Sequence, residues 1–430
     1  MKLWDKGQSI DELFERFTIG QDPILDVLLA HYDVIGSNAH VKMLGTINLL
    51  EKEEVVQIID CLAHIDQLIT DGKFVIEEGI EDCHSQIELM LTRELGDVGK
   101  KVHSGRSRND QVLTCLKLFA KDQLHQIAEL VKTLFDLLQA KSEANKNTLM
   151  PGYTHMQVAM PSSFGLWFGA YAESLVDDLY LLKAATEISD QNPLGSAAGY
   201  GSSFPLDREM TTKEMGFGNL NVNSVYAQMT RGKLEKSVGF ALSSLAGTIA
   251  KLCMDVCMYS GANYDFFSIE KKYTTGSSIM PHKQNPDGFE LVRGKCNQIQ
   301  AMPYELSLIL ANLPSGYHRD LQVLKEKFVP TLLTMKDILV IVTKMLENMA
   351  VNEEIVNDPK YDLLFTVEEV NKLVLEGIPF RDAYRQVGAK IQAGNYKPNK
   401  DIDHTHLGSI GNLGTANIKR KFTAAYDYFG

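Results

Sequence analysis

The stretch Gln111-Val-Leu-Thr-Cys-Leu-Lys-Leu-Phe-Ala-Lys-Asp-Gln-Leu124 opens the longest regular pattern in this 430-residue chain. From Gln111 to about residue 145, apolar residues recur at spacings of three and four, which is the period of an amphipathic α-helix. The repeating positions are Leu113, Leu116, Ala120, Leu124, Ile127, Val131, Leu134 and Leu138. At a rise of about 1.5 Å per residue, such a helix would be about 50 Å long.

Four further stretches carry the same helical period, and strand alternation is nearly absent between them. They lie at about 162–189, 232–263, 287–312 and 329–350. Long helices of matched length are typical of a bundle. We therefore predict an all-α fold with a central long-helix bundle domain at 106–350. Smaller, mostly helical domains are expected at 1–105 and 351–430.

The composition limits the class of protein. A hydrophobic content of 44% and a charged content of 23% are ordinary for a soluble globular protein. The net charge of −12 argues against a nucleic-acid partner, because nucleic acids attract basic surfaces. The opening segment Met1–Lys6 lacks the apolar core of a signal peptide. The longest uncharged stretch, 156–172, contains Pro161 and is a poor membrane span, so no membrane partner is expected.

The six cysteines are scattered along the chain, without a CxxC pair or a Cys/His spacing typical of metal ligands. Cys253 and Cys257 stand four residues apart in a helical stretch, where both would face a core. This pattern predicts a reducing cytoplasm rather than a disulfide framework, and no metal site.

A polar loop is expected between the third and fourth long helices, at Thr275-Gly-Ser-Ser-Ile-Met-Pro-His-Lys-Gln-Asn-Pro-Asp287. Pro281 and Pro286 bar a regular helix until after Pro286. A flexible loop that ends at a helix N-terminus, with Lys283 nearby, is suited to close over an anion. The alternative is an ordinary surface loop.

Segments in this chain resemble the fumarase/aspartase superfamily, whose members are lyases that release fumarate. Gly276-Ser-Ser-Ile-Met-Pro-His-Lys-Gln-Asn285 is similar to the signature of that superfamily. His103-Ser-Gly-Arg-Ser-Arg-Asn-Asp-Gln111 is similar to the segment that separates argininosuccinate lyases from the other members. Further similar segments begin at Asp33, Glu81 and Met150, in the family order, so that the resemblance covers nearly the whole chain.

The resemblance implies a reversible elimination that cleaves argininosuccinate to arginine and fumarate, without a metal or an organic cofactor. It also implies a homotetramer with a shared helical core and active sites built from several subunits. By the same resemblance, Ser277 would be the general base and His155 the general acid. Glu290 would orient His155, and Lys283 would stabilise the doubly charged aci-carboxylate. The residues alone do not decide between Ser277 and Ser278 as the base.

Eleven further positions match binding residues of the family. They are Ser37, His84, Ser107, Arg108, Asn109, Thr154, Ser278, Asn285, Tyr317, Gln322 and Lys325. Each position also has a structural reading. Gly36 and Ser37 could form a turn, His84 could be a structural hydrogen-bonding residue, and Arg108 with Asp110 could be solvated at a helix N-terminus.

Two departures from the family pattern leave the substrate open. The segment Val225–Gly232 keeps Arg231 but lacks the acidic residues that usually flank it, and His282 matches adenylosuccinate lyases better. The alternatives are therefore another fumarate-releasing lyase, such as adenylosuccinate lyase, or a catalytically silent, crystallin-like helical scaffold.

Overall fold

The structure, a computed structural model, describes residues 11–429, so the predicted opening segment Met1–Lys6 lies outside the described residues. The chain divides into two compact units. Unit 1 holds the residues up to Gln126, together with Leu181–Ser243 and Ile299–Met335. Unit 2 holds Ile127–Tyr180, Ser244–Gln298 and Lys336 to the C-terminus. This division does not follow the three domains expected from the sequence, which stay a prediction.

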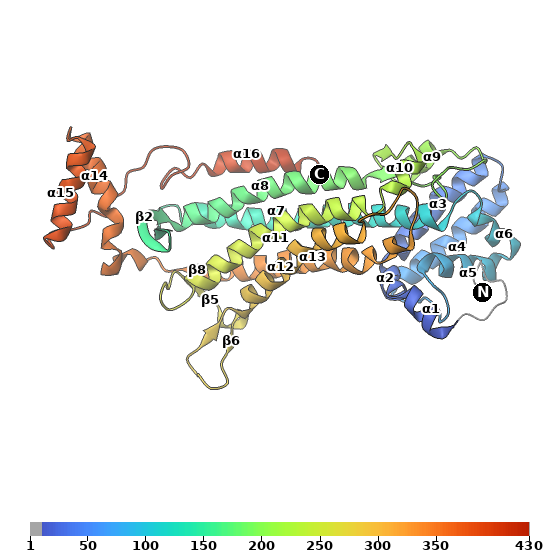
Figure 1. Cartoon of the computed structure of the whole chain (residues 1–430), viewed down its shortest axis with the longest axis horizontal. Helices are drawn as coiled ribbons and strands as arrows, with labels where there is room; N and C mark the ends of the chain where they lie inside the picture. The colour runs from blue at the N-terminus through green and yellow to red at the C-terminus, as the bar shows by residue number, and fades with distance from the viewer. Residues whose placement is uncertain (1–10, 430) are drawn as a thin grey trace. The chain divides into compact units, whose positions relative to one another are not determined.

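Five long helices, labelled in Figure 1, each have one end among the residues of unit 1 and the other end among those of unit 2. They are α7 (Arg108–Ala144), α8 (Phe164–Ser189), α11 (Lys233–Tyr259), α12 (Asp287–Ile309) and α13 (Leu324–Glu347). Their apolar faces are buried: in α7, Leu113, Leu116, Leu124 and Leu134 are fully buried. The predicted all-α class and the five long helices are confirmed.

Within each unit the helix faces fit closely. In unit 1, a Cβ added at Gly239 of α11 would lie 3.5 Å from Pro303 Cγ and 3.6 Å from Met302 Cε of α12, so these two helices lie side by side at ordinary van der Waals distance. In unit 2, the Trp167 Nε1–H and the Tyr171 hydroxyl of α8 donate to Asp255 Oδ2 of α11, at 3.1 and 2.7 Å. These partly buried polar contacts help to fix which faces of α8 and α11 meet.

The first residues of α12 and α13 test the expectation that proline limits where a helix can begin. Helix α12 begins at Asp287, directly after Pro286, as predicted. Helix α13 begins at Leu324 rather than near residue 329, with Pro330 inside it, so the predicted start was wrong. A proline inside a helix removes one backbone hydrogen bond. The helix nevertheless continues across Pro330, and Leu324 and Lys325 in its first turn are buried.

The rest of unit 1 is built from short helices around the starts of α7 and α13. They are α1 (Glu12–Ile19), α2 (Asp22–Leu25), η1 (Asp26–Leu28), α3 (Ala30–Thr46), α4 (Lys52–Thr70), α5 (Cys83–Leu95), α6 (Asp97–Lys100), η2 (Lys101–His103), α9 (Arg208–Glu214), α10 (Ser224–Met229) and η4 (Arg319–Gln322). Strands β3 (Gln191–Asn192) and β4 (Asn219–Leu220) form a two-residue parallel pair. Ser37 lies inside α3, so the turn interpretation at Gly36 and Ser37 was wrong.

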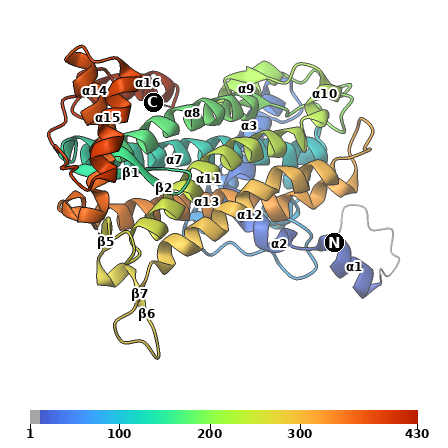
Figure 2. The same cartoon turned by 60° about the vertical axis from the view of Figure 1, so that its left-hand side comes forward.

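Unit 2 carries three small antiparallel pairs. They are β1 (Leu149–Thr154) with β2 (Gln157–Ser163), β5 (Phe267–Ile269) with β8 (Met349–Val351), and β6 (Thr275–Gly276) with β7 (Gln284–Asn285). Its other elements are η3 (Lys271–Tyr273), η5 (Ile355–Asn357), η6 (Pro359–Phe365), α14 (Thr366–Leu375), α15 (Phe380–Gln392) and α16 (Thr415–Tyr426). Figure 2 shows β6 and β7 as a hairpin that projects from the start of α12.

Helix α11 is the one helix in residues 11–429 whose length and composition would let it cross a membrane. Half of its most apolar window is buried inside the protein, as is usual for a core helix. All six cysteines are free, with Cys253 buried and Cys257 half-buried on α11.

We predict that Gly165→Ala destabilises the protein. Gly165 is the second residue of α8, and a Cβ there would lie 2.5 Å from the Ser142 carbonyl oxygen and 2.6 Å from Lys146 Cα. Because these are backbone atoms, relief requires a backbone shift, and we expect the free energy of unfolding to fall by about 1–3 kcal/mol. Urea unfolding followed by circular dichroism measures this change.

The matched control is Gly294→Ala in α12, where an added Cβ meets nothing within 4 Å. It should raise the free energy of unfolding by about 0.4–1 kcal/mol, because alanine has less freedom to lose on folding. Equal unfolding midpoints for the two variants would contradict this account of how α7 and α8 meet.

Candidate active site

A buried ionic centre joins three segments of unit 1. Asp33 of α3 places its Oδ1 2.8 Å from His84 Nδ1 of α5, and both side chains are buried. Gln111 of α7 donates its amide to the same oxygen at 2.8 Å. Burial opposes ionisation of Asp33, but the charges of His84 and Arg106 hold its pKa well below the usual range. The Asp33 carboxylate therefore fixes the orientation of the His84 ring.

Arg106 lies beside this centre and was not among the predicted site residues. Its Nη1–H donates to Ser37 Oγ at 3.0 Å, and both side chains are buried. The motif around residue 106 contains two arginines, but sequence spacing alone did not show which one is buried. Arg106 therefore fixes Ser37, and it brings a cation next to a predicted binding residue.

Two imidazoles are kept neutral near Arg106. Burial and the Arg106 charge lower the pKa of His40 to about 3, and its Nε2–H donates to the Ser104 carbonyl at 2.8 Å. Burial and the charges of Arg106 and Arg108 lower the pKa of His103 to about 4. The cationic character of this region thus comes from the arginines and not from histidine.

The N-terminus of α7 is held by Asp110. Its Oδ1 accepts from the Ser107 N–H at 2.8 Å, and its Oδ2 accepts from the N–H groups of Gly195 and Ala197 at 2.9 and 2.8 Å. Asp110 is fully buried, so the reading in which it is solvated was wrong. The segment that carries Ser107 and Asn109 is therefore locked against the 195–197 loop.

The Arg108 guanidinium lies near two carboxylates of the same unit, those of Asp82 and Glu88. Its guanidinium donates to Gln111 Oε1 at 2.8 Å and to Ser85 Oγ at 3.1 Å, and its Nε lies 3.4 Å from Asp82 Oδ2. The side chain is partly exposed, so part of the guanidinium is accessible to solvent.

The predicted residues near the start of α13 contact the N-terminal segment of the chain. Lys325 Nζ is buried between Asp26 Oδ1 at 2.8 Å and Asp22 Oδ2 at 2.9 Å. Burial opposes its charge, but these two carboxylates raise the pKa of Lys325. Gln322 donates its amide to the Thr18 carbonyl at 2.9 Å. Tyr317 lies partly exposed in the loop before η4.

In unit 2, His155 occupies the turn of the β1–β2 hairpin. Thr154 pairs with Gln157, so His155 and Met156 form a two-residue turn, and both have positive φ angles of 52° and 61°. Such a turn matches the twist of the two strands, but positive φ is uncommon outside glycine. The turn holds the exposed His155 side chain at the tip of a hairpin. The sequence analysis did not predict these two strands.

Ser277 occupies the loop of the second hairpin, β6–β7. Its Oγ accepts from the N–H groups of Ile279 at 3.3 Å and Met280 at 3.1 Å. The Lys283 N–H donates to the Met280 carbonyl at 3.0 Å, which closes the loop. Among the residues that the structure describes, no hydrogen bond of this kind reaches Ser278. The two neighbouring serines therefore differ in environment.

The predicted residues divide between the two units. Unit 1 holds Ser37, His84, Ser107, Arg108, Asn109, Tyr317, Gln322 and Lys325, and unit 2 holds Thr154, His155, Ser277, Ser278, Lys283, Asn285 and Glu290. Within residues 11–429, no hydrogen bond or ion pair joins His155 with Ser277 or Glu290. Glu290, in the first turn of α12, lies 3.9 Å from Arg293. The expected pairing of Glu290 with His155 therefore stays a prediction.

We predict that acid destabilises this region through His40 and His103. Both have folded pKa values below the ordinary value of about 6.5, so the unfolded chain binds more protons between about pH 6.5 and 4. Stability should therefore fall as the pH drops through this window, by up to about 1.4 kcal/mol per pH unit for fully buried His40. His40→Gln should flatten the slope in urea unfolding at pH 7 and pH 5. The exposed His64→Gln is the control, and equal slopes for all three proteins would contradict the prediction.

Comparison with known proteins extends over nearly the whole chain. The Lyase family pattern matches residues 6–301. The chain is 58% identical to argininosuccinate lyase of Parabacteroides distasonis over 417 residues, covering 97% of this chain and 94% of the relative. It is 56% identical to argininosuccinate lyase of Bacteroides thetaiotaomicron, with 100% and 96% covered. With argininosuccinate lyase of Thermotoga neapolitana the identity is 41%, with 90% and 98% covered.

Solved structures share the fold. An EDDS lyase in complex with formate superposes with a TM-score of 0.76 at 22% identity, covering 94% of this chain and 87% of the other. A fumarate lyase:delta crystallin from Brucella melitensis gives a TM-score of 0.75 at 16% identity, with 96% and 93% covered. At these identities the likeness concerns the fold alone, whereas the sequence identities above 40% extend over almost all of each chain. The chain belongs to the argininosuccinate lyase family.

Proposed function

We propose that this protein catalyses the reversible cleavage of argininosuccinate to L-arginine and fumarate. The family membership supports the reaction. The observation that carries the mechanism is the pair of amide N–H groups aimed at Ser277 Oγ in the β6–β7 loop.

The reaction needs a base for a carbon-bound proton next to a carboxylate. A serine hydroxyl is a weak base in water, so its alkoxide must be stabilised by its surroundings. The N–H groups of Ile279 and Met280 would supply fixed donors to that alkoxide, and Lys283 in the same loop adds a cation. Because this support reaches Ser277 and not Ser278, Ser277 is the base in our proposal, and Ser278 and Asn285 contact the substrate.

The leaving guanidinium nitrogen must receive a proton as the carbon–nitrogen bond breaks. His155 is the proposed donor, since an imidazole exchanges protons near neutral pH. Its place in a turn with positive φ fits a functional residue, because such strain is retained where the surrounding structure holds it. Glu290 would orient this imidazole and stabilise its charged form, and Thr154 would contact the substrate from the same turn.

Unit 1 supplies groups that suit the substrate's carboxylates. Arg108 presents a partly exposed guanidinium at the start of α7, and its planar fork matches a carboxylate. Ser37, held by Arg106, and Ser107 with Asn109 add neutral donors. His84, Tyr317, Gln322 and Lys325 complete the binding set that we propose.

We further propose that the working enzyme is a cytoplasmic homotetramer in which different subunits contribute to each active site. Large apolar residues are exposed along the long helices of the single chain, as expected for surfaces that pair in an assembly. They include Tyr180, Phe240, Met254, Leu291, Tyr304, Leu308 and Val340. Six free cysteines accord with a reducing compartment.

We expect Ser277→Ala to lose turnover by roughly 10²–10⁴-fold, the usual contribution of a general base. Ser278→Ala, its matched neighbour, should keep most of kcat and raise KM. The assay follows fumarate formation by absorbance, with argininosuccinate and adenylosuccinate supplied separately. A Ser277→Ala rate near that of the unmodified enzyme would remove Ser277 as the base. Fumarate from adenylosuccinate alone would favour the reading suggested by His282.

His155→Asn separates catalysis from stability. Asparagine tolerates positive φ at least as well as histidine, so the unfolding midpoint should stay unchanged or rise slightly. Turnover should fall by roughly 10²–10⁴-fold, because the proton donor is lost. Unfolding in urea and the fumarate assay measure the two effects. A variant as active as the unmodified enzyme across pH would refute the acid assignment.

A further inference from the structure

Three side chains of unit 1 meet in a buried cluster that the proposed mechanism leaves largely unexplained. We propose that Asp26, Cys83 and His84 form a binding site for a divalent transition-metal ion of the zinc class. Asp26 lies on η1, and Cys83 and His84 open helix α5. Asp26 and Cys83 are 57 residues apart in sequence, so no ligand spacing could reveal the cluster.

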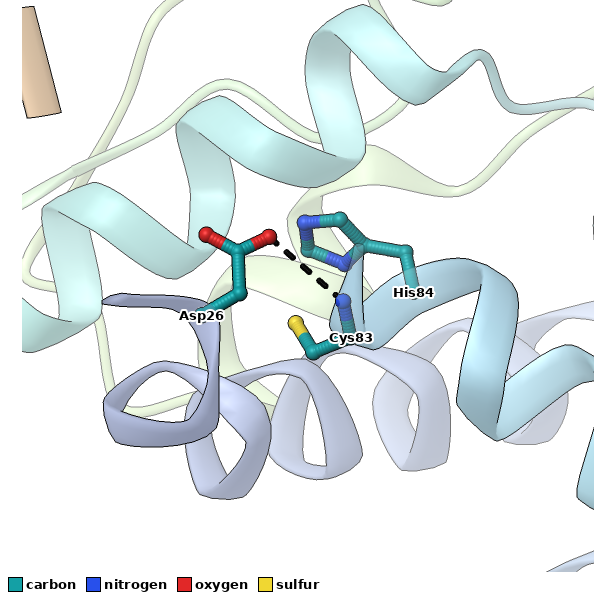
Figure 3. A group of neighbouring side chains, drawn as sticks. All are labelled: Asp26, Cys83 and His84. Atoms are coloured by element: carbon teal, nitrogen blue, oxygen red, sulfur yellow. Dashed lines mark hydrogen bonds between the residues drawn. The ribbon is translucent and has the colours of Figure 1, made fainter. Parts of the chain in front are cut away.

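The geometry suits one ion. One ligand atom from each of the three side chains lies within 4.8 Å of the other two, and all three residues are buried. Figure 3 shows the His84 ring with its Nε2 on the side of the Asp26 carboxylate. The Cys83 sulfur lies below this ring and this carboxylate in the view. The Cys83 N–H also donates to Asp26 Oδ2 at 3.4 Å, which ties η1 to the start of α5. The three ligand atoms therefore lie close enough together to be neighbours of one ion.

A second, independent observation concerns His84. Its Nε2 and its Nδ1 are both buried, and neither has a hydrogen-bond partner among the described residues. The side chain is fully buried, and a buried nitrogen without a partner is costly. Its other nitrogen, Nδ1, lies 2.8 Å from Asp33 Oδ1. A carboxylate that holds one histidine nitrogen while the other nitrogen faces a metal is the usual arrangement around metal-bound histidines.

The ligand types select the class of ion. One sulfur, one imidazole nitrogen and one carboxylate oxygen are ligands that zinc and cobalt accept, whereas magnesium and calcium prefer oxygen alone. Three protein ligands leave a fourth tetrahedral position for water. When the sulfur binds, the Cys83 thiol releases its proton to solvent, so that a thiolate and the Asp26 carboxylate balance the two charges of the ion.

A neighbouring group competes for His84. Asp33, His84 and Cys115 also bring ligand atoms within 4.8 Å of one another. However, Asp33 Oδ1 already lies 2.8 Å from His84 Nδ1, and this close charge contact occupies that side of the ring. We therefore place the ion on the Asp26 side of the ring, with Asp33 as the residue that positions His84.

Metal binding here should inhibit the enzyme. Asp26 Oδ1 accepts from Lys325 Nζ at 2.8 Å, and both Lys325 and His84 belong to the proposed substrate-binding set. An ion on Asp26 would compete with that ion pair and fix His84. This consequence rests on the proposed function, whereas the binding of the ion does not.

The test uses the full-length protein and cobalt(II) as the probe. A thiolate bound to cobalt gives a charge-transfer band in the near ultraviolet, and zinc added afterwards should displace it. We expect one cobalt per chain with this band. Cys83→Ser should abolish the band, and His84→Gln should do the same if Cys83→Ser proves unstable.

Cys61→Ser is the matched control, because Cys61 is a buried thiol of the same unit outside the cluster. Asp33→Asn should weaken cobalt binding by about 10–100-fold.

Two results would overturn the proposal. One is the absence of a thiolate band in the unmodified protein at saturating cobalt. The other is a band that persists in Cys83→Ser and disappears in Cys115→Ser, which would place the ion in the neighbouring group. Because the readout is optical, a failure here is distinct from a failure of the lyase assay.

Discussion

The buried ionic centre around Asp33 is the constraint on which the positions of the unit 1 binding residues depend. Charges removed from water must be paired, and removal of one partner of a buried pair costs about 3–5 kcal/mol. Asp33 meets this need through His84 at 2.8 Å and Gln111 at 2.8 Å, and Arg106 binds Ser37 beside it. Three segments distant in sequence are thereby locked into one rigid surface.

The proposed acid and base, in contrast to the buried binding residues of unit 1, lie in exposed parts of the chain. His155 and Ser277 both occupy exposed hairpin loops in unit 2. Buried, paired groups that bind the substrate and exposed loops that carry the reacting groups suit a reaction that must exclude water, because exposed loops can close over a substrate. The same division explains why the rigid part contains the paired charges, whereas the loops rely on backbone N–H groups, as at Ser277 Oγ.

The sequence predicted the helices well because their apolar period is long and regular. It failed where tertiary contacts overrode a local rule: Pro330 lies inside α13, Ser37 lies in a helix, and Pro151 and Pro161 pair within the β1–β2 hairpin. The motifs located candidate site residues, but spacing does not report burial. The buried roles of Arg106 and Asp110, and the meeting of Asp26 with Cys83, depend on long-range packing that a motif does not contain.

The central claim is that Ser277 and His155 act on one substrate at a site to which several subunits contribute. The most direct measurement mixes two inactive variants, Ser277→Ala and His155→Asn, by joint unfolding and refolding, and then assays fumarate release from argininosuccinate. If different chains supply the two residues, hybrid oligomers contain some sites with both intact, and activity should return. A mixture that forms hybrid oligomers and stays as inactive as its parents would contradict the account.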